Sequence, residues 1–218
     1  MIRKERVVSS ETVDWLDWAR AAFGEALPGA TAYAGLLAGP GMEWGLIGPA
    51  EAERLWERHI ANSLCVAPLV PAGAVVADLG SGAGLPGIPL ALARPDVRVE
   101  LVEPMQRRVD FLDLCVRELG LRDRVEVVRA RAEEYAGSAT VLTARAVARL
   151  DKLVRLVSGL VPPAVLLAIK GERAEAECGA AASLLGARGL VAEVVRPVVA
   201  GRVVGSVVRV GAAEESMG

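Results

Sequence analysis

A short apolar strand that runs into a cluster of glycines is the feature that most constrains this chain. Residues 75–84 read Val-Val-Ala-Asp-Leu-Gly-Ser-Gly-Ala-Gly, and a further glycine follows at position 87. Glycine adopts backbone conformations that other residues avoid, and it lets a bound molecule approach the main chain closely. A strand that stops at such a loop and leads into a helix is typical of α/β domains that bind a nucleotide.

Two classes of nucleotide compete for this loop. Gly82, Gly84 and Gly87 satisfy the Gly-x-Gly-x-x-Gly pattern of dinucleotide sites, where a pyrophosphate lies on a helix N-terminus. Asp78, however, stands two residues before Gly80, where its charge would repel phosphates. S-adenosylmethionine has no phosphate, and its sulfonium and ammonium groups are attracted by a carboxylate. The spacing therefore favours S-adenosylmethionine over a nicotinamide dinucleotide.

A second acidic residue supports a nucleoside ligand. Glu103 directly follows the next expected strand, residues 97–102, and lies ~20 positions after the loop. A carboxylate in this place accepts hydrogen bonds from the two ribose hydroxyls. Both nucleotide classes use this contact, so Glu103 does not choose between them.

Strands and helices alternate from residue 75 onward. We expect strands at 75–79, 97–102, 125–128, 140–144 and 164–169, with helices at 86–94, 104–119, 148–160 and 172–188. Two final strands, at about 190–196 and 203–210, have no helix between them. The pattern predicts an α/β fold, a doubly wound Rossmann-like sheet that is mostly parallel with an antiparallel C-terminal strand, as in class I methyltransferases.

The segment before the sheet has helical character. Residues 9–24 and 50–67 carry apolar side chains at helical spacing, while the Gly- and Pro-rich residues 28–49 are expected to connect them with no more than short helical turns. We therefore divide the chain into an N-terminal helical extension, residues 1–72, packed on a core domain, residues 73–212, that binds S-adenosylmethionine.

Composition limits the class of protein. A net charge of −2 over 218 residues argues against a protein that coats nucleic acid by bulk charge, but it allows a local basic patch. The three cysteines, at positions 65, 115 and 178, have no metal-ligand spacing, so we expect neither a metal site nor a disulfide framework. No apolar run approaches the ~20 residues of a membrane span, and the N-terminus lacks a signal peptide. We expect a cytoplasmic protein.

Six short segments, in order, resemble the RsmG (GidB) family. They are Arg58-His59-Ile-x-Asn62-Ser63, Asp78 to Leu90, Arg107-Arg108-Val-x-Phe111-Leu112, Arg131-Ala-Glu133-Glu134, Ala144-Arg145-Ala146 and Ile169-Lys170-Gly171. The run Gly84-Leu-Pro-Gly-Ile-Pro-Leu90 is the most specific. Members of this family are S-adenosylmethionine-dependent methyltransferases that act on guanine N7 in 16S ribosomal RNA. The resemblance implies 16S ribosomal RNA or the small ribosomal subunit as partner, and we expect a monomer.

The loop and the resemblance together give a set of site residues. For the cofactor we expect Asp78, Gly80, Ser81, Gly82, Gly84, Leu85, Glu103, Ala132, Glu133 and Arg145, with the Ala132-Glu133 segment beside the adenine. For the substrate the resemblance implies Arg131 and Lys170, and we add His59 and Arg202. Arg202 departs from the usual family spacing, and Asn62 stands where many members have aspartate. His59 either makes a structural hydrogen bond or lies beside the methionine end of the cofactor or the substrate entrance.

Guanine N7 offers a free lone pair, so its methylation needs no general base, and the enzyme mainly supplies positioning. We expect Arg145, at the end of the fourth strand, to be the catalytic residue that orients the guanine or holds an adjacent phosphate. On this hypothesis Arg145→Ala abolishes methylation and leaves cofactor affinity nearly intact. The alternatives are a methyltransferase for a small molecule or protein, a catalytically silent RNA-associated domain, and an NAD-dependent oxidoreductase.

Overall fold

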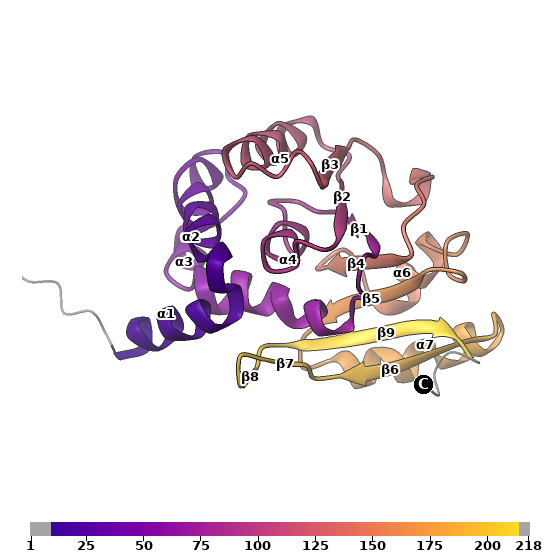
Figure 1. The fold of residues 1–218 in the computed structure, drawn as a ribbon. Helices are drawn as coiled ribbons and strands as arrows, with labels where there is room; N and C mark the ends of the chain where they lie inside the picture. Colours follow the sequence, from indigo (N-terminus) through magenta and orange to yellow (C-terminus); the bar gives the residue numbers. More distant parts are fainter. Residues whose placement is uncertain (1–9, 214–218) are drawn as a thin grey trace, which may run out of the picture.

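A seven-stranded mixed sheet forms the centre of the protein (Figure 1). The computed structural model describes residues 10–213, with side chains from residue 15 onward. The strands lie in the order β3-β2-β1-β4-β5-β9-β6, with β1–β5 parallel to one another and β9 antiparallel to β5 and β6. Their bounds are β1 Val75–Leu79, β2 Arg98–Val102, β3 Val125–Val128, β4 Val141–Arg145, β5 Val165–Lys170, β6 Leu190–Val195 and β9 Ser206–Ala212. The predicted sheet with its antiparallel C-terminal strand is confirmed.

Helices cover both faces of this sheet. They are α4 (Gly87–Ala93), α5 (Gln106–Glu118), α6 (Leu150–Leu156) and α7 (Ala174–Gly186). Side chains alternate along each strand, so Val76 packs in the core on the side of α4 and α5, whereas Ala77 and Leu79 pack in the core on the side of α6 and α7. Apolar residues cover both sides, which explains why the central strands β1, β4 and β5 read as nearly continuous apolar runs.

The N-terminal segment is more helical than expected. It contains α1 (Ser10–Phe23), α2 (Leu27–Leu36), α3 (Pro49–Ala52), and the irregular helical turns Gly24–Ala26, Leu37–Gly41, Leu55–Ala61 and Leu64–Leu69. The expectation of a connecting region over 28–49 was wrong in its first part, because α2 lies there. Ala30 and Tyr33 of α2 are fully buried, and a Cβ at Gly29 would lie 2.9 Å from Leu92 of α4. Glycine here allows close helix packing rather than a turn.

These N-terminal helices share one hydrophobic core with the sheet. Buried side chains of the helices, such as Tyr33 and Ile60, belong to the same cluster as Val76 of β1 and Leu167 of β5. In Figure 1 the helices α1 and α2 lie beside α4. Residues 1–9 of the proposed extension lie outside the described residues, and the division at residue 72 stays a prediction.

A small hairpin interrupts the C-terminal strands. The strands β7 (Val198–Val199) and β8 (Arg202–Val203) pair with each other between β6 and β9, so the expected single strand at 203–210 is split. The indole of Trp18 in α1 donates a hydrogen bond to Val199 O at 2.9 Å, and the Arg202 guanidinium lies 5.3 Å from the Trp15 ring centre. The hairpin therefore packs against α1 (Figure 1).

Candidate active site

The glycine loop lies at the carboxyl end of β1, in the middle of the parallel strands. Gly80 has a φ of +68° and Gly84 a φ of +96°, which non-glycine residues rarely adopt. A Cβ at Gly84 would also lie 2.4 Å from Ile88 of α4. The loop is fixed to the neighbouring strand because Gly80 N and Ser81 N both donate to Val102 O, at 2.8 and 3.0 Å.

Asp78 supports this loop from inside the protein. Its carboxylate has no exposed surface and accepts hydrogen bonds from Ser81 Oγ at 2.5 Å, Gly87 N at 3.0 Å and Thr143 Oγ1 at 3.0 Å. Burial raises the pKa of Asp78 to about 6, although these hydrogen bonds oppose the rise. Asp78 thus holds the loop and the start of α4 together, and its direct contact with a cofactor stays a prediction.

Glu103 meets the same loop from the end of β2. Its side chain is 1% exposed, and it accepts hydrogen bonds from Gly82 N at 3.0 Å and Met105 N at 3.1 Å. Arg108 of α5 lies 3.5 Å from its Oε2 atom. The acidic residue expected to hold a ribose is therefore placed directly against the glycines.

A cavity of about 250 Å³, called here the loop cavity, opens beside these glycines. Its lining combines main chain of the loop with side chains from the N-terminal segment, α5 and the end of β4. It comprises Leu46, Ile47, Glu51, His59, Gly80, Ser81, Gly82, Ala83, Leu85, Arg108, Arg145 and Ala146. The structure brings five of the expected cofactor residues to this one cavity, and it adds His59.

The Ala132-Glu133 segment lies elsewhere. Both residues belong to a short helical turn, Ala132–Glu134, that follows β3. Glu133 is exposed, and Glu134 Oε2 accepts a hydrogen bond from Arg131 N. The assignment of this segment to the adenine end of the cofactor stays a prediction.

Arg145 is anchored to the N-terminal segment. It ends β4 on the face that these helices cover, and its Nη1 donates to His59 O at 3.1 Å and to Ser63 Oγ at 3.2 Å. Its Nη2 donates to His59 Nδ1 at 2.7 Å. Burial lowers the pKa of both Arg145 and His59, and the neighbouring Arg145 charge lowers the pKa of His59 further. Because Arg145 holds a wall of the loop cavity, the expectation that its removal spares cofactor affinity no longer follows.

Three residues of the site were missed by the sequence analysis. The hydroxyl of Tyr33 in α2 donates to Ala83 O in the loop at 2.7 Å. Ser63 accepts a hydrogen bond from Arg145, and Thr143 is the register partner of Asp78 in the neighbouring strand. Strand parity alone would have found Thr143, because it shares a face with Arg145 two positions later. Tyr33 lay in the segment expected to be a loop.

A second hollow of about 460 Å³, the strand-end pocket, adjoins the loop cavity. It is lined by Asn62, Arg145, Ala146, Ala148, Arg149, Ile169, Lys170, Gly171 and Glu177. Arg145 and Ala146 line both hollows, and Ala146 has a φ of +56°, a strained value for a residue with a Cβ. The two hollows thus share a wall at the end of β4.

Lys170 has structural partners in the strand-end pocket. Its ammonium donates to Ala148 O at 2.5 Å and lies 2.9 Å from Glu177 Oε2 of α7, with only 11% of the side chain exposed. Glu177 also accepts a hydrogen bond from Leu150 N at 2.8 Å. The Lys170–Glu177 pair therefore ties β5 to α7 and to the start of α6.

The remaining expected substrate residues are dispersed. Arg202 lines a third hollow of about 810 Å³, the hairpin pocket, together with Trp15, Glu57, Arg58, Asn62, Gly171, Val203 and Val204. Asn62 and Gly171 line both this pocket and the strand-end pocket. Arg131 is exposed beyond β3, which three strands separate from β5. The structure therefore groups Lys170 and Arg202 in adjoining hollows but not Arg131.

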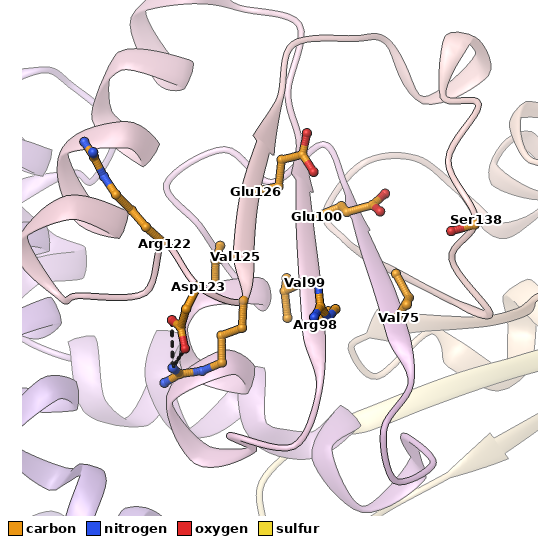
Figure 2. A pocket seen from close by; sticks show the side chains of 10 residues that line it. Val75, Arg98, Val99, Glu100, Arg122, Asp123, Val125, Glu126 and Ser138 are labelled. Carbon is orange, nitrogen blue, oxygen red and sulfur yellow. Dashed lines mark hydrogen bonds and ion pairs between the residues drawn. The ribbon is translucent and has the colours of Figure 1, made fainter.

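A fourth hollow, of about 370 Å³, lies at the amino ends of the strands, on the side of the sheet away from the glycine loop (Figure 2). Its wall contains Val75, Val99 and Val125, at the amino ends of β1, β2 and β3, and the register partners Glu100 and Glu126. Ligands of open α/β sheets bind at the carboxyl ends of the strands, so this hollow is separate from the candidate site. Within residues 10–213, no helix is long and apolar enough to cross a membrane, and no cluster of acidic, His or Cys side chains is arranged for a metal ion.

Comparisons with known proteins agree with this geometry. A family model described as GidB, rRNA small subunit methyltransferase G, matches residues 27–202. Ribosomal RNA small subunit methyltransferase G of Mycolicibacterium smegmatis is 56% identical over 161 residues, which cover 71% of this chain and 68% of that protein. The protein of the same name from Acidothermus cellulolyticus is 56% identical over 164 residues, covering 75% and 73%.

Solved structures agree with the fold alone. Mitomycin 7-O-methyltransferase MmcR superposes with a TM-score of 0.54 at 18% identity, covering 96% of this chain and 74% of that one. Trm5b from Pyrococcus abyssi superposes with a TM-score of 0.53 at 14% identity, covering 72% and 48%. The expected class I methyltransferase architecture is thereby confirmed.

Proposed function

The chain belongs to the GidB family of rRNA small subunit methyltransferases, and we propose that it transfers a methyl group from S-adenosylmethionine to N7 of a guanine in 16S ribosomal RNA. The observation that carries the proposal is the shared wall between the loop cavity and the strand-end pocket. Arg145 and Ala146 separate a hollow beside the glycine loop from a hollow open to the surface. A methyl donor and a methyl acceptor need such adjoining sites.

The residues at the loop fit the cofactor. Glu103 lies at Gly82 on the β2 side, where it would hold the ribose hydroxyls, and the positive φ of Gly80 lets the loop turn beneath the ligand. Arg145 and His59 line the loop cavity together with Gly80 and Gly82. Bound S-adenosylmethionine supplies an activated methyl group, so the protein has to position the acceptor rather than activate it.

No protein group has to remove a proton from the target base. Guanine N7 carries a free lone pair, and the product gains positive charge. A cation against the imidazole ring of the base would oppose this charge. We therefore assign Arg145 to the positioning of the cofactor cavity and to contact with O6 or a phosphate, not with N7 itself.

A continuous series of hollows supports an RNA substrate. The strand-end pocket shares Asn62 and Gly171 with the hairpin pocket, so the series runs from the glycine loop to the hairpin β7–β8. Arg149, Arg58 and Arg202 line it. Cations along such a path can contact successive phosphates, although the net charge of the chain is −2.

The competing proposal is a methyltransferase for a small molecule, which the likeness to MmcR leaves open because that likeness concerns the fold. RNA binding through phosphates weakens steeply as salt rises, whereas binding of a neutral small molecule does not. Cytoplasmic location and a monomeric state stay predictions.

The experiment uses small ribosomal subunits from a strain that lacks this methylation. The protein is incubated with these subunits and with S-adenosylmethionine labelled in the methyl group, and the modified nucleotide is mapped by nuclease digestion and mass spectrometry. We expect one labelled N7-methylguanosine in 16S ribosomal RNA, with a yield that falls as salt is raised. Absence of label, or label on a different base, would refute the proposal.

A further inference from the structure

The ring nitrogen Nε2 of His59 is buried, and nothing in the described part of the chain forms a hydrogen bond with it. The side chain of His59 is 7% exposed. The nearest acidic oxygen, Glu51 Oε1, lies 3.7 Å away, which is too far for a hydrogen bond. An unpartnered polar atom in the wall of a cavity calls for a ligand, because leaving it unpaired is costly.

The partner of the other ring nitrogen fixes where the proton sits. Arg145 Nη2 lies 2.7 Å from His59 Nδ1. A guanidinium has only N–H donors, so Nδ1 must accept and the proton of the neutral ring must be on Nε2. Burial and the Arg145 charge both lower the pKa of His59, which favours this neutral form. His59 therefore presents an N–H group to the loop cavity.

The strand order decides which end of the cofactor reaches this group. β1 lies between β2 and β4, so Glu103 at the end of β2 and Arg145 at the end of β4 lie on opposite sides of the glycine loop. A nucleoside held by its ribose at Glu103 would have to extend across β1 to reach Arg145 and His59. The part of S-adenosylmethionine farthest from the adenine is its amino-acid end, which carries one carboxylate and one ammonium group. Of these two groups, only the carboxylate can accept a hydrogen bond.

We propose that His59 Nε2–H donates a hydrogen bond to the α-carboxylate of S-adenosylmethionine, and that Arg145 acts partly by holding His59 in the tautomer that allows this. This inference rests on the proposed cofactor. Of the roles that the sequence left open for His59, it selects the one beside the methionine end of the cofactor, not the substrate-binding role to which His59 was assigned. The further contacts of Arg145, from Nη1 to His59 O and to Ser63 Oγ, fix the guanidinium that holds this tautomer.

Two substitutions separate this role from a purely structural one. In His59→Asn the amide lies near the former Nδ1 position, so it can still meet Arg145 but offers no donor at Nε2. In His59→Gln the amide reaches the Nε2 position, so the donor is kept and the contact with Arg145 is weakened. If His59 binds the carboxylate, Asn is the damaging replacement and Gln the tolerated one. If His59 only anchors Arg145, the order is reversed.

The ligands are chosen to isolate the carboxylate. Calorimetric titration compares S-adenosylhomocysteine, which has the whole amino-acid end, with 5′-methylthioadenosine, which lacks it, and with decarboxylated S-adenosylmethionine, which keeps only the ammonium. We expect His59→Asn to weaken S-adenosylhomocysteine binding on the order of tenfold to hundredfold, as for a hydrogen bond to a charged group. Affinity for the other two ligands should stay within about twofold of the wild-type value, a difference below the worth of one hydrogen bond.

The unsubstituted protein gives an independent readout, because position 59 is the only histidine in the chain. After labelling with ¹⁵N-histidine, the ring nitrogens should show a protonated Nε2 and a bare Nδ1. S-adenosylhomocysteine should shift the Nε2 resonance and slow exchange of its proton, whereas 5′-methylthioadenosine should leave it in place. An Nε2 signal that ignores S-adenosylhomocysteine, or responds equally to both ligands, overturns the inference while leaving the proposed function intact. Wild-type protein that binds none of the ligands overturns the proposed cofactor and the inference with it.

Discussion

Replacing Tyr33 with phenylalanine removes one oxygen atom from the contact between the N-terminal helices and the glycine loop. The Tyr33 hydroxyl donates to Ala83 O at 2.7 Å, and the side chain has no exposed surface. The ring of phenylalanine fills the same space, so no cavity forms. The substitution therefore tests the hydrogen bond alone.

The size of the effect follows from burial. Ala83 is 8% exposed, so its carbonyl would be left with little access to water once the hydroxyl is gone. An unsatisfied buried group of this kind costs about 1–3 kcal/mol. In a domain of this size, each kcal/mol lowers the melting temperature by roughly 2–4 °C. We expect a loss of about 1–3 kcal/mol, together with a fewfold weaker binding of S-adenosylhomocysteine, because Ala83 lines the loop cavity.

Tyr135 is the matched control. The chain has two tyrosines, and the Tyr135 hydroxyl donates to Oε2 of Glu100, which lines the hollow at the amino ends of the strands. Tyr135→Phe also removes the hydroxyl of a mostly buried ring, and with it the bond to Glu100 and the one accepted from Ala139 N at 3.3 Å, but Tyr135 does not line the loop cavity. Urea unfolding gives the free energy of unfolding of both variants, and calorimetry gives their cofactor affinity. Both variants should be less stable than wild type, and only Tyr33→Phe should bind S-adenosylhomocysteine more weakly.

Two results would refute this reasoning. If Tyr33→Phe is as stable as wild type within ~0.5 kcal/mol, the contact to Ala83 adds nothing that water does not replace. If both variants lose affinity for S-adenosylhomocysteine equally, the loss results from lower global stability and not from the missing contact with the glycine loop.

Three further perturbations test other contacts of the site. Gly84→Ala places a Cβ 2.4 Å from Ile88 at a φ of +96°, so we expect it to lose several kcal/mol in urea unfolding and to bind cofactor poorly; near-native affinity would show that the loop can shift. Glu177→Gln removes the charge opposite Lys170 while keeping an oxygen for Leu150 N, so methylation should fall with little change in cofactor affinity, and a parallel loss of both would place the pair at the cofactor. The pKa of Asp78 in the folded protein is raised from 3.8 to about 6, so its contribution to stability is present below pH ~4 and is lost as pH rises through 6. The free energy of unfolding of wild type minus that of Asp78→Asn should therefore fall over this pH range, by about 3 kcal/mol at most. A difference that rises with pH would contradict the assigned shift.

The parallel strands were predictable because their signal is local. β1, β4 and β5 are short, mostly apolar runs that end near a glycine or a charged residue, and burial on both faces removes the polar alternation of an exposed sheet. In β2 and β3 this pattern is interrupted by Arg98, Glu100 and Glu126. The helix α2 was not predictable in the same way. Its sequence, Leu-Pro-Gly-Ala-Thr-Ala-Tyr-Ala-Gly-Leu, contains two glycines and a proline, which disfavour a helix in isolation. Packing against α4 overrides that preference.

The cofactor side of the site could also be predicted from local sequence patterns. Gly80, Gly82 and Glu103 follow directly from the strand that precedes each of them, and the structure places all three around one loop. The substrate side was less readable, because a cation in a sequence does not reveal its partner. Lys170 was expected to face the substrate, and its register at the end of β5 turns it toward Glu177 of α7. That ion pair depends on tertiary packing that no local pattern encodes.

The contact between Arg145 and His59 joins residues 86 positions apart, and it unites two parts of the chain that the sequence analysis treated separately. Strand alternation puts Asp78, Thr143 and Arg145 on the face that the N-terminal helices cover. The side chain of Arg145, at the end of β4, therefore contacts polar groups of those helices. These groups are His59 Nδ1, His59 O and Ser63 Oγ, and each of them accepts a hydrogen bond from Arg145. The N-terminal segment thus completes a wall of the loop cavity, in addition to packing on the core. A truncated chain that lacks residues 1–72 would therefore lose both Tyr33 and His59 from the site, even if its sheet still folded.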